Sequence, residues 1–192
     1  PIRSQFRAVT SRNPKFRHHH HRITISQRCC TLHVALQHNV PEAVVMALFE
    51  AWPDAAKVKD SDGYTPLHLA AKYHATDAVV RALVASFPGA LKEVTAITTH
   101  WDSNQPIGGG DTVLHALATA ACSSIAESRN ANTICFTLVE KRASLTATNA
   151  LGQTPAEGSR ADPVPDRYGG YWRSRKPNPH LIASFREIAA YK

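Results

Sequence analysis

Residues 62–71 read Asp-Gly-Tyr-Thr-Pro-Leu-His-Leu-Ala-Ala, and this stretch decides the fold. Its apolar residues follow the i, i+3, i+4 spacing of a helix at Leu67, Ala70 and Ala71. The threonine can cap that helix with its hydroxyl, and the proline can take the first helical position, where a missing N–H is harmless. The Asp-Gly pair in front supplies a turn. The stretch therefore predicts a turn followed by a short helix with one buried face.

The same pattern recurs along the chain, which makes it a structural repeat. Sliding residues 30–59 by 35 positions onto residues 65–94 gives eleven identities in thirty without a gap. A third copy begins with Thr-Val-Leu-His at 112–115, and a partial fourth begins with Gly-Gln-Thr-Pro-Ala-Glu at 152–157. Each full copy holds two apolar helical stretches, so each repeat is predicted to be a pair of helices. Stacking of neighbouring repeats would bury the surface that one repeat alone leaves wet.

The stretch at 62–71 resembles the signature of ankyrin repeats, and the resemblance covers roughly residues 30–158. It implies repeats of two antiparallel helices followed by a projecting loop or hairpin. The first copy has Cys30-Thr31 in place of the Thr-Pro pair, and the third has Val113 in place of the proline. We therefore predict an all-α, ankyrin-type α-solenoid of three to four irregular repeats, with a disordered basic N-terminal arm and a C-terminal capping helix.

The predicted boundaries follow the copies. The basic arm, disordered or targeting, takes 1-28; the repeats take 29-160, divided at about 29-62, 63-110, 111-151 and a partial 152-160; and a Pro-rich linker with the capping helix takes 161-192. The capping helix is predicted from an apolar stripe made of Leu181, Ile182, Phe185, Ile188 and Ala189. It would close the end of the solenoid, and the alternative is a helix that binds a partner.

The excess of positive charge lies in the arm. The chain has 22 Lys and Arg against 15 Asp and Glu, a net charge of +7, and residues 1–28 hold seven of the basic residues and no acidic one. This composition is typical of an organellar transit peptide, of an arm that contacts phosphate, or of a disordered tail. The histidine run at 18–21 lacks the spacing of metal ligands, so no metal site is predicted.

What the ankyrin resemblance implies about function is a non-catalytic protein–protein interaction module. Such a module binds a protein partner through its hairpin tips and concave helical face. His33, His68 and His115 share one repeat position, at which the family uses histidine to hydrogen-bond between turns. We predict no catalytic residues, metal or cofactor, because no nucleophile, base and orienting group recur at the spacings that a known mechanism requires. The alternative is nucleic-acid or anionic-surface binding through the basic arm, with the repeats as scaffold.

The predicted partner-binding residues are those that the repeat pattern leaves free. They are Gln37, His38, Asp60, Tyr64, Lys72, Tyr73, Trp101 and Asp102. The last two lie on an insertion at 95–110, which should lengthen one finger. A second insertion, at 121–130, is predicted to be a longer turn between two helices. Glu157, three residues after Thr154, is predicted to complete a capping box.

Composition also bears on the location of the chain. No apolar run approaches the ~20 residues that are needed to cross a bilayer. The four cysteines are too few and too irregularly placed for a disulfide scaffold. Together these features favour an intracellular, cytoplasmic protein, with organellar targeting by the arm as the alternative. We expect a monomer that binds a protein partner, whose identity the sequence does not reveal.

Overall fold

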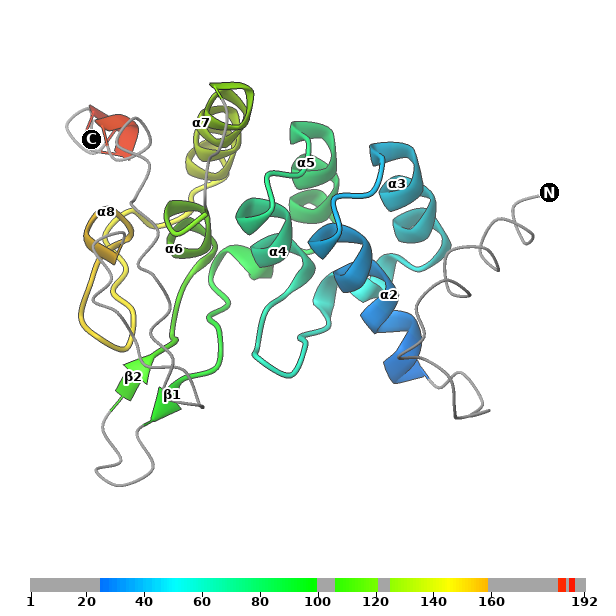
Figure 1. The fold of residues 1–192 in the computed structure, drawn as a ribbon, viewed down its shortest axis with the longest axis horizontal. Helices are drawn as coiled ribbons and strands as arrows, with labels where there is room; N and C mark the ends of the chain where they lie inside the picture. Colours follow the sequence, from blue (N-terminus) through cyan, green and yellow to red (C-terminus); the bar gives the residue numbers. More distant parts are fainter. Residues whose placement is uncertain (1–24, 100–105, 121–124, 159–182, 186, 189–192) are drawn as a thin grey trace.

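The computed structural model describes residues 25–99, 106–120, 125–158, 183–185 and 187–188. Over these residues the chain forms helix pairs that stack side by side in a row (Figure 1). Loops project from one side of the row, and two of the described segments there pair as short strands. The predicted fold class, an all-α solenoid of ankyrin type, is confirmed.

The elements of each repeat follow the same order. The first repeat contains α2 (Ile25–Gln37), α3 (Glu42–Ala51) and the 3-10 turn η2 (Pro53–Lys57). The second contains α4 (Pro66–Lys72), α5 (Asp77–Ser86) and η3 (Pro88–Leu91). The third contains α6 (Val113–Ala118) and α7 (Ile125–Glu140), and α8 (Pro155–Gly158) begins the partial fourth. Helices α2, α4, α6 and α8 form an inner layer next to the projecting loops, and α3, α5 and α7 form an outer layer (Figure 1).

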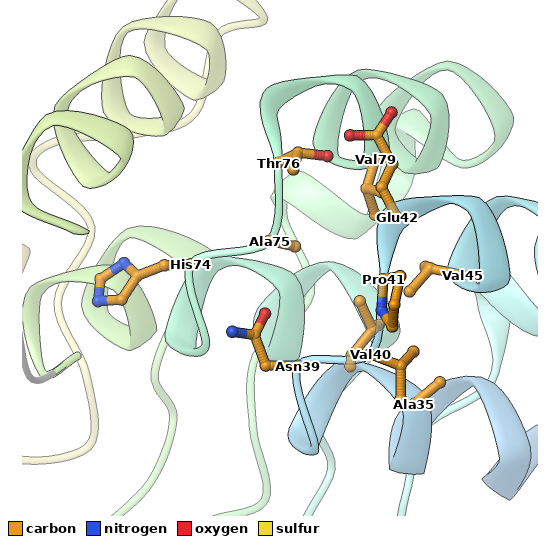
Figure 2. Close-up of a pocket in the computed structure, with 11 residues that line it drawn as sticks. Ala35, Asn39, Val40, Pro41, Glu42, Val45, His74, Ala75, Thr76 and Val79 are labelled. Atoms are coloured by element: carbon orange, nitrogen blue, oxygen red, sulfur yellow. The ribbon is translucent and has the colours of Figure 1, made fainter. Parts of the chain in front are cut away.

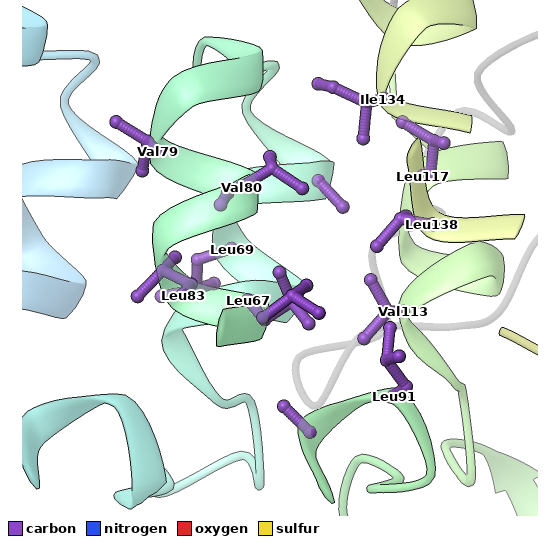
Figure 3. Packing of buried hydrophobic residues seen from close by; sticks show 14 of the residues in the cluster. Leu67, Leu69, Val79, Val80, Leu83, Leu91, Val113, Leu117, Ile134 and Leu138 are labelled. Atoms are coloured by element: carbon purple, nitrogen blue, oxygen red, sulfur yellow. The ribbon is translucent and has the colours of Figure 1, made fainter. Parts of the chain in front are cut away.

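The core lies between these two layers of helices and between successive repeats. Val79 and Val80 lie on opposite sides of α5, with Val79 toward the preceding repeat (Figure 3). On the other side, Ile134 and Leu138 of α7 are fully buried, as is Leu67 of α4 at 1% exposure. Because each helix pair packs against the pair that follows it, the burial of one repeat depends on the next.

The structure differs from the sequence expectation at the start of the first repeat. Helix α2 begins at Ile25, inside the segment 1–28 that was assigned to the arm. In the second repeat, Pro66 disfavours helical geometry at Thr65, so α4 cannot extend backwards. The first repeat has Thr31 at the proline position, and nothing there ends the helix. The rest of the predicted arm lies outside the described residues.

The described part of the second insertion, residues 125–130, is helical, whereas a longer turn was predicted there. Residues 125–130 belong to α7, which is therefore longer than the other outer helices. The added helical turns carry Asn130, whose Nδ2 donates to the carbonyl oxygens of His74 at 2.6 Å and Ala75 at 3.1 Å. The insertion thus ties the outer helix of the third repeat to the turn between α4 and α5.

Three histidines join each inner helix to the repeat that follows. In each case the ring Nε2 lies within hydrogen-bond distance of a carbonyl oxygen in the next repeat. That carbonyl belongs to the residue directly before the N-cap of the next inner helix. The pairs are His33 with Tyr64 at 3.2 Å, His68 with Asp111 at 3.2 Å, and His115 with Gln153 at 2.8 Å. The predicted structural role of these histidines is confirmed.

The other ring nitrogen of His68 caps its own helix. The backbone N–H of Thr65 donates to Nδ1 at 3.3 Å, and the Thr65 hydroxyl lies 2.8 Å from the same atom. A carbonyl can only accept, so Nε2 carries the proton toward Asp111 and Nδ1 is the acceptor. Thr112 and His115 repeat this arrangement at 3.2 and 2.9 Å. A neutral ring is therefore required at this position.

Burial lowers the pKa of His68 to about 4, from an ordinary value of 6.5. The unfolded chain then binds this proton more tightly than the folded chain, so the stabilisation is complete above pH 6.5 and is lost as the pH falls toward 4. We expect this residue alone to remove about 3 kcal/mol of unfolding free energy over that window. Urea denaturation at pH 7 and pH 5 measures about 2 kcal/mol of this loss, and His68→Gln, which cannot titrate, should show a shallower pH dependence. Equal slopes in the two proteins would contradict the prediction.

The projecting loop before α4 is held by a side chain. One carboxylate oxygen of Asp60 accepts the backbone N–H groups of Asp62 at 3.0 Å and Tyr64 at 2.8 Å. Asn149 does the same before α8, where its Oδ1 accepts the N–H groups of Leu151 and Gln153, both at 3.0 Å. Each loop is therefore a tight turn that the sequence specifies with one Asx residue.

Neighbouring loops are joined through their backbones. The N–H of Ala96 donates to the carbonyl of Asp62 at 2.9 Å, and the N–H of Ala150 donates to the carbonyl of Gly109 at 3.1 Å. Between these contacts, β1 (Thr98–Thr99) pairs antiparallel with β2 (Pro106–Gly108). The predicted long finger is thus a two-stranded ribbon at its base, and residues 100–105 lie outside the described segments.

The C-terminal segment contacts the third repeat. Phe185 is 2% exposed and belongs to the main core, and Ile188 packs against that core. The Ser184 hydroxyl donates to Oδ1 of Asn132 in α7 at 3.4 Å. The part of the predicted capping helix that the structure describes therefore docks on α7, while Leu181, Ile182 and Ala189 fall outside the described part.

Gly63 and Gly152 both have positive φ angles, but only Gly63 lies against the backbone of the neighbouring loop. Gly63 has a φ of +80°, and a Cβ there would lie 2.3 Å from the backbone nitrogen of Ala96, whereas Gly152 has a φ of +74° and open space around it. We expect Gly63→Ala to destabilise the fold by about 3 kcal/mol, from strain and overlap together, and Gly152→Ala by about 1 kcal/mol. Urea denaturation compares the two variants. Equal losses would show that the loop at 60–64 does not hold the neighbouring finger.

Candidate functional site

The last turn of each inner helix presents side chains to solvent. Gln37, Lys72 and Thr119 each lie seven residues after the position that aligns with the Thr65 cap. Gln37 and Thr119 are exposed, and Lys72 is half-buried. The next position holds His38 and Tyr73, which are also exposed. We call these five residues the inner row: Gln37, His38, Lys72, Tyr73 and Thr119.

Three of the predicted site residues come together on α4. The Nζ of Lys72 lies 4.6 Å from the ring centroid of Tyr64 and 6.0 Å from that of Tyr73. It also donates to the Tyr64 hydroxyl at 3.4 Å. The Tyr64 ring packs edge-on against His68, with 6.1 Å between the ring centroids. A positive charge is thereby held between two aromatic rings on the inner surface.

The hydroxyl of Tyr64 keeps its proton and can donate a hydrogen bond. Burial raises its pKa to about 12, and the negative charges of Asp111, Asp62 and Asp60 add to that effect. Asp60 and Asp62 belong to the loop before α4, and Asp111 directly precedes the cap residue of α6. The phenol therefore stays protonated near neutral pH.

A cavity of about 170 Å³ lies at the turns that follow the inner row. It opens between the α2–α3 turn and the α4–α5 turn, whose side chains surround it in Figure 2. Most of the lining is aliphatic. The lining residues are Ala35, Leu36, Asn39, Val40, Pro41, Glu42, Val45, His74, Ala75, Thr76 and Val79. Two of them, Asn39 and His74, have positive φ angles of 48° and 55° and begin the two turns.

The other predicted site residues are placed differently. The Asp60 carboxylate is occupied by the backbone of its own turn. Trp101 and Asp102 lie outside the part of the chain that the structure describes. The structure adds Ile97, which is 59% exposed at the base of the long finger. Its exposure could not be read from the sequence, because the repeat pattern has no counterpart for the insertion.

A polar network on the outer helices is structural. The Thr137 hydroxyl donates to Asp77, and Arg81 contacts Asp77 at 2.6 Å and Thr137 at 3.1 Å. Partial burial alone would raise the pKa of Asp77, but the hydrogen bonds from Thr137 and Arg81, with the charge of Arg81, lower it. These contacts connect α5 with α7 and leave no open group for a ligand.

Two observations concern metal ligands and nucleophiles among the described residues. No group of three or more His, Cys, Asp or Glu among them is placed to hold a metal ion. Cys135 is fully buried, and burial raises the pKa of its thiol to about 12, so the nucleophilic thiolate does not form. Within the same residues, no helix has the length and apolar character needed to cross a membrane.

Comparison with known proteins finds similarity at the level of structure. No protein-family model matches the chain, and no curated protein matches it. Among solved structures, it is similar to the ankyrin repeat domain of Bcl-3, a unique member of the IkappaB protein family, with 18% sequence identity and a TM-score of 0.43. The match covers 81% of this chain and 50% of that chain, so this chain spans about half the length of its neighbour. A likeness at this level does not bear on the function.

The protonated state of Tyr64 can be tested by titration. We expect one tyrosine to ionise near pH 12, well above the ordinary value of 10.0, because its phenolate would be buried beside carboxylates. Absorbance titration of the native protein should show this late step, and Tyr64→Phe should remove it while leaving the earlier steps. A late step that survives in Tyr64→Phe would show that the phenol is not held in this environment.

Proposed function

We propose that this chain is a non-catalytic recognition module that binds a segment of a protein partner across its inner helices. The observation that carries the proposal is the inner row. Residues at equivalent positions of three successive repeats face solvent, although nearly all of α4 and all of α6 are buried. A partner segment that crosses the helices would meet one such position in each repeat.

The chemistry of the inner row supports this proposal. Tyr73 is 36% exposed and sits beside a lysine that contacts two rings. Tyrosine supplies a large contact area with few rotatable bonds, and such residues dominate binding energy at protein interfaces. The cavity at the following turns offers an aliphatic recess next to these polar groups. The hairpin tips would extend the surface, with Ile97 as an exposed apolar contact.

The rigidity of the scaffold supports it as well. The inner row stands on helices that contribute to the buried core and that His33, His68 and His115 join to the following repeat. A surface that is already ordered loses little conformational entropy when it binds. The fold therefore favours capture of a partner segment without rearrangement of the helices.

Site-specific photocrosslinking tests where the partner binds. A photoreactive phenylalanine analogue at Tyr73 should crosslink to a partner in native cells, and the same analogue at Phe136 should not. Phe136 is the matched control because it is 58% exposed on outer helix α7. Tyr73→Ala should weaken capture by about 2 kcal/mol, since exposed aromatic anchors carry much of an interface's energy, and it should leave helical circular dichroism unchanged. Crosslinks at Phe136 but not at Tyr73 would move the binding surface to the outer helices.

The same experiment separates the alternative function. Binding of nucleic acid through the basic arm should fall steeply with salt and should vanish when residues 1–24 are removed, because phosphate contacts release counterions. The truncation stops before Ile25, where α2 begins. Recognition by the inner row should survive both changes. Loss of crosslinking at Tyr73 in the truncated chain would favour the arm.

A further inference from the structure

We infer that the inner row selects a partner segment with an acidic side chain, whose carboxylate binds the Lys72 ammonium and the Tyr64 hydroxyl. The inference rests on the proposed function, because it names the chemistry of the segment that this surface would hold. It concerns one position of that segment. Three observations carry it: the state of the lysine, the convergence of two donors, and the comparison with the other repeats.

Lys57 and Lys59 have ion-pair partners that Lys72 lacks, and the exposed Lys92 also forms no ion pair with a described residue. Lys57 pairs with Asp54 at 2.8 Å, and Lys59 pairs with Glu93 at 2.7 Å. Lys72 forms no ion pair with any residue that the structure describes, although it is half-buried and partly stripped of water. Its contacts are two aromatic rings and one hydroxyl. A cation over an aromatic ring at a partly exposed site gains only about 0.5–1 kcal/mol, so a carboxylate would be the stronger partner.

Two donors converge at this point. The Tyr64 oxygen lies 3.4 Å from the Lys72 nitrogen, close enough for one carboxylate to accept from both. The phenol keeps its proton, because its pKa is raised to about 12 by burial and by nearby carboxylates. An acceptor with two oxygens and a negative charge therefore matches what the two side chains offer.

The position in the repeat does not by itself demand a positive charge. A lysine in the last turn of a helix interacts favourably with the helix dipole, and this would be the simpler explanation of Lys72. However, Gln37 and Thr119 hold the same position at the ends of α2 and α6, and neither is charged. The dipole also does not account for the two tyrosines on either side. The cluster on α4 is thus specific to one repeat.

The surrounding charges fix the orientation of the segment. The negative charges of Asp60, Asp62 and Asp111, which lie in or next to the projecting loops, act on Tyr64 from its own end of the cluster. Two of these carboxylates are already engaged, Asp60 by its own turn and Asp111 by Nδ2 of Asn149 at 3.1 Å. The acidic residue of the partner must therefore lie at the Lys72 end, away from the fingers. Residues of the segment that point toward the fingers should be neutral or basic.

Selection from a displayed pool of random peptides on the immobilised full chain tests the inference. Peptides that bind the wild-type chain should be enriched in Asp or Glu at one position. Replacing that residue by Gln or Asn should weaken binding about tenfold, and Lys72→Met should weaken it by a similar factor. In Lys72→Met the peptide substitution should have a clearly smaller effect, since only the Tyr64 hydroxyl then remains to hold the carboxylate. Lys92→Met, which removes an exposed lysine directly after η3, should bind like the wild type.

The remaining outcomes distinguish the inference from the proposed function. Peptides without an enriched acidic residue would overturn the inference, as would an acidic residue whose replacement weakens binding equally in Lys72→Met. If peptides without an enriched acidic residue still lost binding to Tyr73→Ala, the inference would fall and the proposed function would stand. If no peptide were enriched, both would fall. Lys72→Arg should restore the acidic preference, and unchanged urea midpoints in all variants would show that the fold is intact.

Discussion

The hydrogen bond from the inner-helix histidine to the next repeat is the interaction on which the rest of the structure depends. The residues that it joins are separated by 31, 43 and 38 positions in the three cases. The distance in space stays the same although the chain between the partners varies. Inserted residues are therefore expelled from the stack, into the long finger at 95–110 and into the start of α7. Repeats of unequal length keep a common register because one contact per repeat sets it.

The chemistry of that contact explains why the ring must be histidine. One ring nitrogen accepts from the cap of its own helix, and the other donates to a carbonyl of the next repeat. A neutral imidazole is the one side chain that offers an acceptor and a donor on opposite sides of a rigid ring. The same rigidity reaches the last turn of the helix, where Lys72 stands four residues after His68. The surface that we propose for recognition is thus fixed by the contact that orders the repeats.

The sequence predicts the parts of the structure that recur from one repeat to the next. The helix pairs, the histidine contacts and the capping box at Thr154, where Glu157 accepts at 2.8 and 3.0 Å, all follow from local spacing. Boundaries set from the repeat alignment miss the start of α2 and the extension of α7, although Thr24 and Ser124 directly before them are residue types that favour the N-cap position. The Tyr64–Lys72 contact was also out of reach, since it depends on the path of two side chains along a helix. The prediction named both residues as free and did not bring them together.

Exposure in a solenoid has two causes, and the comparison of repeats separates them. Val34 is 48% exposed while its counterpart Leu69 is 1% exposed, and Val44 is 41% exposed while Val79 is 2% exposed. The valines of the first repeat are open because no described helix pair lies before them. The inner row behaves differently: Lys72 lies between two repeats and still reaches solvent, as Gln37 and Thr119 do. Its exposure is a property of the position in the repeat, so a longer or shorter stack would leave it unchanged.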